Sequence, residues 1–263
     1  MRPSRVWFPG ILFFCFAATL IAQNPSSSTP QALTTLQSAF QALAGKTTVN
    51  DATLTGSAEW IAGSDDETGT VVLKTTSGAN RLDLNLSAGT RSEIRSSAAS
   101  GPVGGWIGPD GVSHAMAYHN VMTDAGWFPA FILGNLISSS NTVLVYVGQE
   151  TRNGASVIHI SASQQFPNLS GDSATLMQHL THVDIYLDPT TSLLVSYLFN
   201  SHPDNNALLD IPTEIRYSNY QTFGGAQIPL HVQKFINNTL TLDLQFQNAA
   251  LNTGITAAQI IAQ

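Results

Sequence analysis

The stretch TEIRYSNYQTFGGAQIPLHVQKFINNTLTLDLQF, residues 213–246, contains three extended segments joined by two short turns. The segments are residues 213–220, 228–235 and 240–246, with Gly224-Gly225 and Asn237-Asn238 between them. Leu242, Leu244 and Phe246 alternate with polar residues, which is the period of a strand with one buried face. We therefore predict a meander of antiparallel strands in this region.

The same period of two recurs along most of the chain. Leu82, Leu84 and Leu86 alternate with polar residues, and a weaker strand at 91–96 is predicted with Ile94 facing inward. Asn153-Gly154 is a hairpin signal. Further strands are predicted at residues 54–60, 70–75, 143–147, 157–160, 183–187 and 193–199. The total of about eleven strands, joined by tight turns, predicts an antiparallel sheet that must curl or close.

Two helices complete the predicted fold. Leu33, Leu36, Phe40 and Leu43 recur at helical spacing between Pro30 and Gly45. Residues 126–137, GWFPAFILGNLI, are apolar on nearly every side, and Pro129 suits the first turn of a short helix. Residues 101–111 are interpreted as a glycine-rich loop, residues 164–180 as a looser stretch with a helical turn, and residues 257–261 as a final turn of helix. The prediction is a mainly β (α+β) fold: a strongly curved sheet or incomplete β-barrel whose concave face is covered by the N-terminal and the central apolar helix.

The N-terminus has the pattern of a secretory signal. Arg2 and Arg5 precede an apolar run at 6–20, and cleavage is expected near Ala22 or Gln23. The alternative, a membrane anchor, is disfavoured because the run is short for a span of about 20 residues and is interrupted by proline and glycine. We expect a signal peptide at 1–23, a polar linker at 24–30, and a single β domain at 31–263, located in the periplasm or secreted, with no transmembrane span.

Composition limits the partners of the mature chain. Without Arg2 and Arg5 it has eight basic and seventeen acidic residues, a net charge of −9, which argues against nucleic acid and anionic membrane surfaces. The only cysteine, Cys15, lies in the signal segment, so the mature chain has no thiol for catalysis or metal binding.

A family resemblance rests on three segments. These are YQTFGGAQIP at 220–229, FQNAALNTGI at 246–255 and the LDPTT hairpin at 187–191. Together with the N-terminal helix they resemble the exported LolA/LolB-like superfamily of bacterial envelope proteins. The resemblance implies an incomplete antiparallel barrel with helices over its concave face, and a cavity of the kind in which several such proteins carry lipids or lipoprotein acyl chains.

No motif indicates a catalytic, cofactor or metal site. The sequence has no G-x-S-x-G and no phosphate-binding glycine fingerprint. His179, His182 and Asp184 are spaced closely, but the spacing alone is weak support for a metal site. His159 is expected to be solvated, and Asp65, Asp66 and Glu67 to form a solvated turn. We therefore predict no enzyme, no cofactor and no metal.

The candidate binding residues are aromatic and aliphatic. They are Trp106, Trp127, Phe128, Phe131, Ile132 and Leu136. A short helix that is apolar on every side must be buried in the core or must face a ligand. We predict an exported, non-catalytic envelope protein that binds or carries a lipid or acyl chain between sheet and helices. The alternative is a structural or interaction protein with a solid core and an envelope protein partner.

Overall fold

The computed structural model describes residues 27–98 and 101–262. The proposed signal peptide, its cleavage site and the first part of the linker lie outside these residues. No helix in the described part of the chain is long and apolar enough to cross a membrane.

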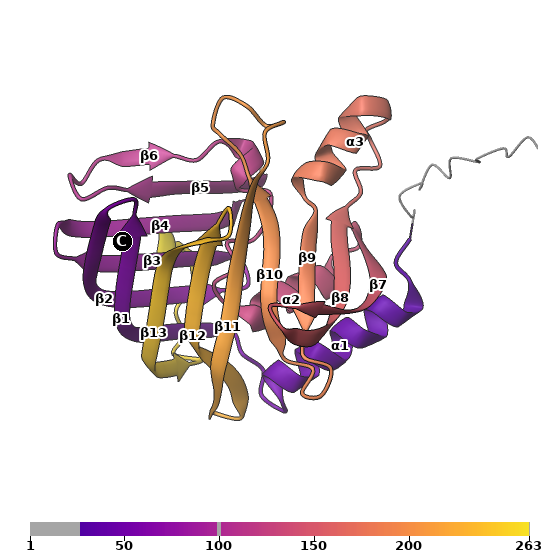
Figure 1. The fold of residues 1–263 in the computed structure, drawn as a ribbon, viewed down its shortest axis with the longest axis horizontal. Coiled ribbons are helices and arrows are strands. Elements are labelled where there is room, and N and C mark those ends of the chain that lie inside the picture. Colours follow the sequence, from indigo (N-terminus) through magenta and orange to yellow (C-terminus); the bar gives the residue numbers. More distant parts are fainter. Residues whose placement is uncertain (1–26, 99–100, 263) are drawn as a thin grey trace, which may run out of the picture.

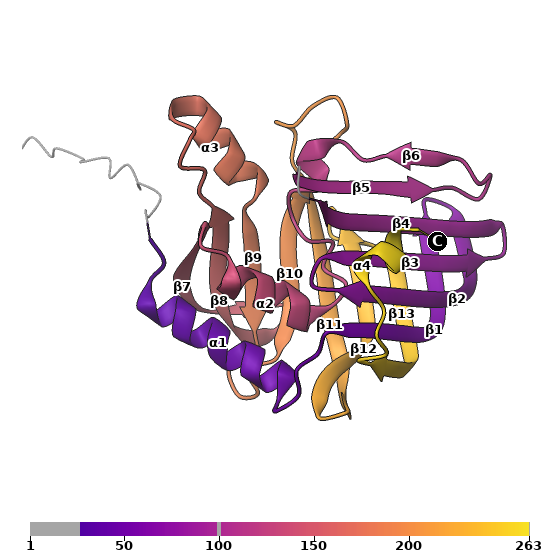
Figure 2. The same cartoon turned by 180° about the vertical axis from the view of Figure 1, so that it is seen from behind.

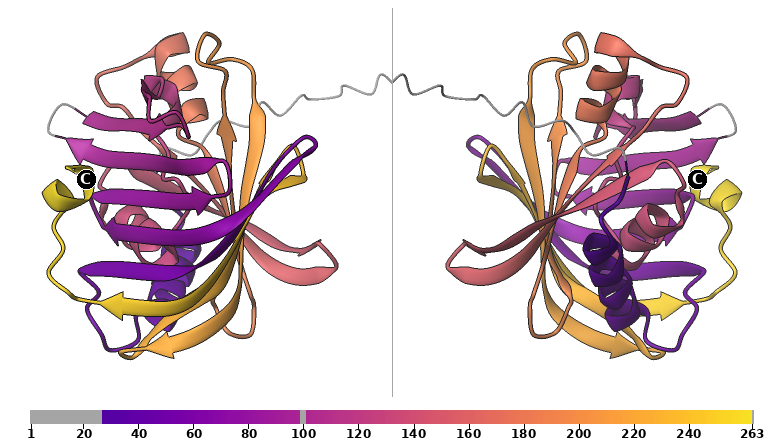
Figure 3. Two further views of the ribbon diagram at one scale, coloured as in Figure 1. Left: turned by 90° about the vertical axis from the view of Figure 1, so that its left-hand side faces the viewer. Right: turned by 90° about the vertical axis from the view of Figure 1, so that its right-hand side faces the viewer.

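In the described residues, thirteen strands form one continuous sheet in which every neighbouring pair is antiparallel (Figure 1). In chain order they are β1 (Asp51–Ala62), β2 (Asp65–Thr76), β3 (Ala79–Leu86), β4 (Gly89–Ala98), β5 (Gly101–Ile107), β6 (Ser113–Ala115), β7 (Thr142–Arg152), β8 (Ala155–Gln164), β9 (Val183–Leu187), β10 (Leu194–Ser201), β11 (Ile211–Phe223), β12 (Ala226–Ile236) and β13 (Thr239–Leu251). Figure 3 shows that this sheet is strongly curved.

The order of the strands places the opening of the sheet at the middle of the chain. It is β6-β5-β4-β3-β2-β1-β13-β12-β11-β10-β9-β8-β7, so β1 pairs with β13 in the interior and the two edges are β6 and β7. These edge strands are consecutive in sequence. The segment between them, which includes the apolar residues 126–137, therefore connects the two edges of the open sheet.

The predicted hairpins are confirmed by their backbone geometry. Asn153 and Gly154 have φ of 51° and 80°, Gly224 and Gly225 have 55° and 92°, and Asn237 and Asn238 have 48° and 62°. Two consecutive positive φ angles match the tight turn whose twist suits antiparallel strands, and glycine and asparagine adopt them most easily. The turns thus fix the register of the meander at the places where the sequence indicates them.

The N-terminal and the central helix cover the concave face (Figure 2). α1 (Pro30–Ala44) packs against α2 (Pro129–Ser138), β7 and β12, with Leu36 and Leu43 fully buried as predicted. α4 (Ala257–Ile261) lies instead on the outer side of the sheet, where it packs against β2, β3 and β4 and its Ile260 is fully buried (Figures 2 and 3). α3 (Gly171–Leu180) and the short 3-10 helix η1 (Tyr118–Asn120) lie in connections between strands.

Two predictions about the middle of the chain were wrong. Residues 101–107 form β5 rather than a loop, and β6 follows it, which raises the number of strands from about eleven to thirteen. Strand pairing with β4 overrides the weak strand propensity of a segment rich in glycine and proline. Likewise, residues 171–180 form a ten-residue helix instead of a single helical turn.

The inward leucines of the central strands should carry much of the folding stability. Leu244 is fully buried, and Leu244→Ala is expected to lower the free energy of unfolding by about 2–5 kcal/mol because it leaves a cavity. The neighbouring Gln245 is exposed, so Gln245→Ala should change it by about 0.5 kcal/mol or less. Denaturant unfolding followed by circular dichroism measures both, and equal losses would contradict the assignment of the inner face.

Candidate functional site

The apolar segment at 126–137 is anchored to the inner wall of the sheet at its first residue. Gly126 has φ of 84°, and a Cβ there would come within 2.6 Å of Ile215 Cγ1, so only glycine fits. Its N–H donates to Asp124 Oδ1 at 2.8 Å, and the Tyr217 hydroxyl donates to its carbonyl at 2.6 Å. The segment therefore enters the concave face at a fixed point on β11.

α2 follows immediately and spans the concave face. Pro129 occupies the first turn, where its missing N–H costs nothing, and residues Pro129–Leu133 are buried. At the other end, the Asn135 side chain donates to the carbonyl of Ser77 at 2.9 Å. Because Ser77 lies in the β2–β3 turn, α2 bridges from the C-terminal half of the sheet to the N-terminal half.

Two hollows flank this helix. One, which we name the inner cavity, has a volume of about 410 Å³ and lies between α2, the β2–β3 turn and the start of β5. The other, which we name the helix groove, has a volume of about 510 Å³ and lies between α2 and the C-terminal end of α1. Both volumes fall in the range of small-molecule binding sites, about 300–1,000 Å³.

The structure brings three of the six predicted binding residues to these hollows. Phe131 lines the helix groove, and Ile132 and Leu136 line the inner cavity. Trp127 and Phe128 are buried in the core beside α2 and line neither hollow. Trp106 lies apart from the others on β5, where its ring stacks on His114 with 3.9 Å between centroids and 44% of the residue remains exposed.

The inner cavity also has a charged wall that the sequence analysis did not identify. Arg95 and Asp124 line it together with the apolar Ile132, Leu136 and Val183. The prediction that Ile94 faces inward is wrong. The register pairs Glu93 with Leu82 and Arg95 with Asn80, which puts both charged side chains on the concave face and Ile94 on the opposite one.

Four ionisable side chains meet at this wall. Arg95 Nε donates to Glu93 Oε1 at 2.8 Å, and Lys234 Nζ lies 4.0 Å from Glu93 Oε2. Burial disfavours ionisation of Glu93, but the attraction of Arg95 and Lys234 outweighs it and lowers the pKa of this carboxyl. Burial lowers the pKa of Lys234 and raises the pKa of Asp124.

Arg95 also holds the segment that forms one side of the cavity. Its Nη1 donates to the carbonyls of Asn120 and Thr123 at 2.8 and 3.2 Å. Tyr118 and Val103 line the same cavity and are about half exposed, so they mark its mouth. The cavity is therefore open to solvent near η1 and has Arg95 and Asp124 in its wall.

His179 and His182, the two candidate metal ligands, each pair with a carboxylate. His179 Nε2 lies 2.9 Å from Asp210 Oδ1, whereas His182 Nε2 lies 3.3 Å from Asp184 Oδ1, so the two candidate ligands have different partners. No group of three ligating residues in the described part of the chain is arranged to hold a metal ion.

Two further expectations about polar residues were wrong. His159 is not solvated: its Nε2 lies 2.8 Å from Asp184 Oδ1, and its ring packs on Tyr186. Glu67 is not part of a solvated turn, because it is buried at the inner face and pairs with Arg91 at 2.7 Å. Strand pairing brings both residues next to partners that are distant in sequence, which periodicity alone does not reveal.

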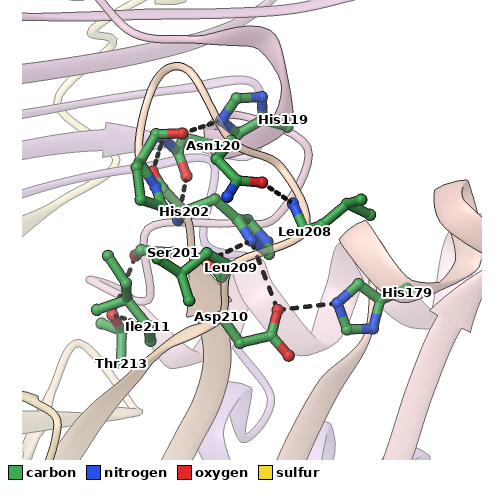
Figure 4. Close-up of polar contacts among 12 residues, drawn as sticks. His119, Asn120, His179, Ser201, His202, Leu208, Leu209, Asp210, Ile211 and Thr213 are labelled. Atoms are coloured by element: carbon green, nitrogen blue, oxygen red, sulfur yellow. Dashed lines mark hydrogen bonds and ion pairs between the residues drawn. The ribbon is translucent and has the colours of Figure 1, made fainter.

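His202 anchors the connection between β10 and β11 (Figure 4). Its side chain is fully buried, and its Nδ1 lies 3.2 Å from the Leu209 carbonyl and 3.5 Å from Asp210 Oδ1. Burial lowers the pKa of His202, and the nearby His119 and His179 lower it further. The neutral imidazole thus closes the base of the loop at 202–210.

Comparisons with known proteins identify the architecture. No protein-family model and no curated protein sequence matches the chain. Among solved structures, an outer membrane lipoprotein-sorting protein domain from Vibrio parahaemolyticus superposes with a TM-score of 0.54 at 11% identity, covering 88% of this chain and 96% of that one. A LolA superfamily protein from Nitrosomonas europaea gives 0.51 at 8% identity, covering 84% and 93%. The fold is LolA-like.

The LolA-like fold extends over nearly the whole described chain. A DUF1329 family protein from Desulfovibrio piger gives a TM-score of 0.56 at 8% identity and covers 89% of this chain and 98% of that one. The resemblance inferred from the three sequence segments is therefore confirmed at the level of fold. At these identities the match concerns the fold alone, so the site has to be argued from the residues of this chain.

The anchoring of the β10–β11 loop in this LolA-like fold should weaken in acid. An unfolded histidine ionises near pH 6.5, and the folded pKa of His202 lies lower, so its contribution to stability is present above about pH 6.5 and is lost as the pH falls through the folded pKa. Amide hydrogen exchange of residues 202–210 should therefore be faster at pH 5 than at pH 7.5 after correction for intrinsic rates.

The variant His202→Asn isolates this residue from its neighbours. Asp210, His119 and His179 face His202 and can also titrate in acid. An asparagine amide can donate to the Leu209 carbonyl but does not ionise in this range. In His202→Asn, the amide exchange rate of residues 202–210 should change less with pH than in the wild type. An identical change in both proteins would mean that another group causes the pH dependence.

Proposed function

We propose that this protein is an exported envelope protein that binds or carries an apolar ligand, a lipid or an acyl chain, without catalysis. The observation that carries the proposal is the position of α2, an apolar helix with a hollow on each side. An ordinary core helix would be packed against side chains all round. Here Phe131 faces one hollow, and Ile132 and Leu136 face the other.

Three further observations support this proposal. The LolA-like fold is shared with a protein domain described as sorting outer membrane lipoproteins. The N-terminal sequence has the pattern of a signal peptide, which agrees with a periplasmic or secreted location. The sequence contains no catalytic motif that would favour an enzyme.

The direct test is to identify the ligand of the native protein. Protein purified from the periplasm should release a lipid or fatty acid on organic extraction, detected by mass spectrometry in stoichiometric amount. The purified chain should also bind a fluorescent fatty acid. Protein that is consistently free of ligand and does not bind this probe would contradict the proposal.

Phe131 should contribute more to binding than to folding. Phe131→Ala is expected to weaken binding of the fluorescent fatty acid, and to cost less than the about 3–5 kcal/mol of a fully packed phenylalanine, because the ring lines the helix groove. Leu133 is fully buried on the same helix and lines neither hollow. Leu133→Ala should therefore cost about 2–5 kcal/mol and leave binding unchanged.

Thermal melts and titrations of the two variants separate the two roles of the helix. If Phe131→Ala is as destabilising as Leu133→Ala and takes up ligand like the wild type, the helix is ordinary core. The idea that it forms the wall of a binding site would then be abandoned.

One observation favours the alternative, an interaction protein of the envelope. The open sheet leaves β6 and β7 as edges. Ser28 and Thr29 bond to the backbone of Leu144 and Tyr146 on β7, but Val147 beyond them is half exposed. An unpaired edge is a template for strand addition by another chain. A single stoichiometric envelope protein recovered with the purified chain, in the absence of lipid, would promote this function above the carrier.

A further inference from the structure

The inner cavity has an unusual wall for a site that would hold only hydrocarbon. Ile132, Leu136 and Val183 supply its apolar part. Arg95 and Asp124 supply charge in the same cavity. Removing charged groups from water is costly, and hydrophobic packing of similar volume can often replace a buried ion pair without loss of stability. A charged group in the cavity wall is therefore a feature that packing does not explain.

The donors of Arg95 are only partly used by the protein. Nε donates to Glu93, and Nη1 donates to the carbonyls of Asn120 and Thr123. Among the described residues no partner accepts from Nη2. A guanidinium in the wall of a cavity, with a donor left over, is suited to a ligand that carries an acceptor oxygen.

The charges around the cavity favour an anion. Arg95 and Lys234 carry two positive charges, and Glu93 compensates one of them. Asp124 is the fourth ionisable side chain of this group. Burial raises its pKa, so its neutral form is favoured relative to a solvated aspartate. With Asp124 protonated and Lys234 charged, the four groups carry one net positive charge, and with Asp124 ionised they are neutral overall.

We propose that the inner cavity binds an amphiphile with a single anionic head group, with the head at Arg95 beside Asp124 and the chain against Ile132, Leu136 and Val183. This inference rests on the proposed function, because it assumes that the cavity takes an apolar ligand. It adds the chemistry of the head group. A fatty-acid carboxylate is the simplest member of the class, since it accepts from a guanidinium at one oxygen and from a protonated carboxyl at the other.

Asp124 is then a positioning residue that controls the charge of the site. Its ionised form repels an anionic head, and its protonated form can donate to it. The charged and titratable groups that face Asp124 are Arg95, Glu93, Tyr197 and Tyr217, with Lys234 behind Glu93. Of these, Arg95 favours its ionised form and Glu93 its neutral form, while burial is the largest influence.

The first experiment compares two ligands that differ only in the head. A medium-chain fatty acid and the alcohol of the same chain length are titrated against the purified full chain at pH 7 by displacement of a fluorescent fatty acid. A charge-assisted hydrogen bond predicts that the acid binds about tenfold or more tightly than the alcohol. In Arg95→Gln this preference should disappear, while binding of the alcohol remains.

The second experiment uses Asp124→Asn, which does not depend on altering Arg95. Asparagine retains the oxygen that accepts from the Gly126 N–H, so the turn is preserved. An alkyl sulfonate serves as probe because it stays ionised at every pH used. Because burial raises the pKa of Asp124, wild-type affinity for the sulfonate should rise as the pH is lowered, whereas Asp124→Asn should bind it tightly and with little change over the same pH series.

A matched control is available on the same protein. Asp110 accepts from the Val112 N–H two residues on, the same local bond that Asp124 makes with Gly126, but it is exposed and does not line the inner cavity. Asp110→Asn should behave like the wild type at every pH. A change in this control equal to that of Asp124→Asn would show that the effect comes from the turn, and would overturn the proposal.

The outcomes distinguish this inference from the proposed function. If neither acid, alcohol nor sulfonate binds, the proposed carrier function fails, and this inference with it. If acid and alcohol bind the wild type with equal affinity, the carrier function stands and the anionic head group is rejected. If the preference for the acid survives in Arg95→Gln, the carrier function stands and the placement of the head group at Arg95 is rejected.

Discussion

The pairing of β1 with β13 is the contact on which the rest of the structure depends. It joins the meander β1–β6, from the first half of the chain, to the meander β7–β13, from the second half. A Cβ on Gly56 would collide with the backbone of Gln245 and Phe246, so this pairing requires glycine at its closest approach, next to the irregularity between Thr55 and Gly56. Without it the two meanders would be separate sheets, each with an additional exposed edge.

This pairing also determines where the apolar helix must lie. Because the two ends of the chain meet inside the sheet, the opening falls between β6 and β7, and residues 116–141 must connect these edges. The segment is anchored at Gly126 to β11 and at Asn135 to the β2–β3 turn. A helix of ten residues held at both ends cannot fill a curved sheet of thirteen strands, and the two hollows beside it are the space that remains.

The strand pattern and the turns were predictable because both depend on local chemistry. Leu82, Leu84, Leu242 and Leu244 are buried as their alternation indicates, and the Asn-Gly, Gly-Gly and Asn-Asn pairs form the turns.

The residues of the cavity wall were not predictable from the sequence in the same way. At 91–96 the residues with odd numbers are the charged ones, and placing Ile94 inward followed the rule that apolar residues face the core. Only the register with β3 shows that Glu93 and Arg95 face inward. The surroundings of Trp106 and His159 were not predictable for a related reason. Trp106 stacks on His114 and His159 pairs with Asp184, and both partners come from other strands.

Two largely buried ion pairs lie on the concave face, Glu67–Arg91 and Glu93–Arg95. They differ in what surrounds the arginine. Glu67 accepts from Arg91 and from the Ala88 N–H, and the Arg91 guanidinium lies over the Trp60 ring at 4.0 Å, so this pair is packed on the protein itself. Arg95 makes equivalent bonds to Glu93, but it also borders open space together with Asp124. Both pairs carry a desolvation cost, and both are held by further contacts within the chain, but only the second borders the inner cavity. Positions where a sequence departs from the rules of core packing without an internal compensation tend to be functional. The mixed charged and apolar lining of the inner cavity therefore indicates a ligand-binding site more strongly than the apolar surroundings of Trp127 do.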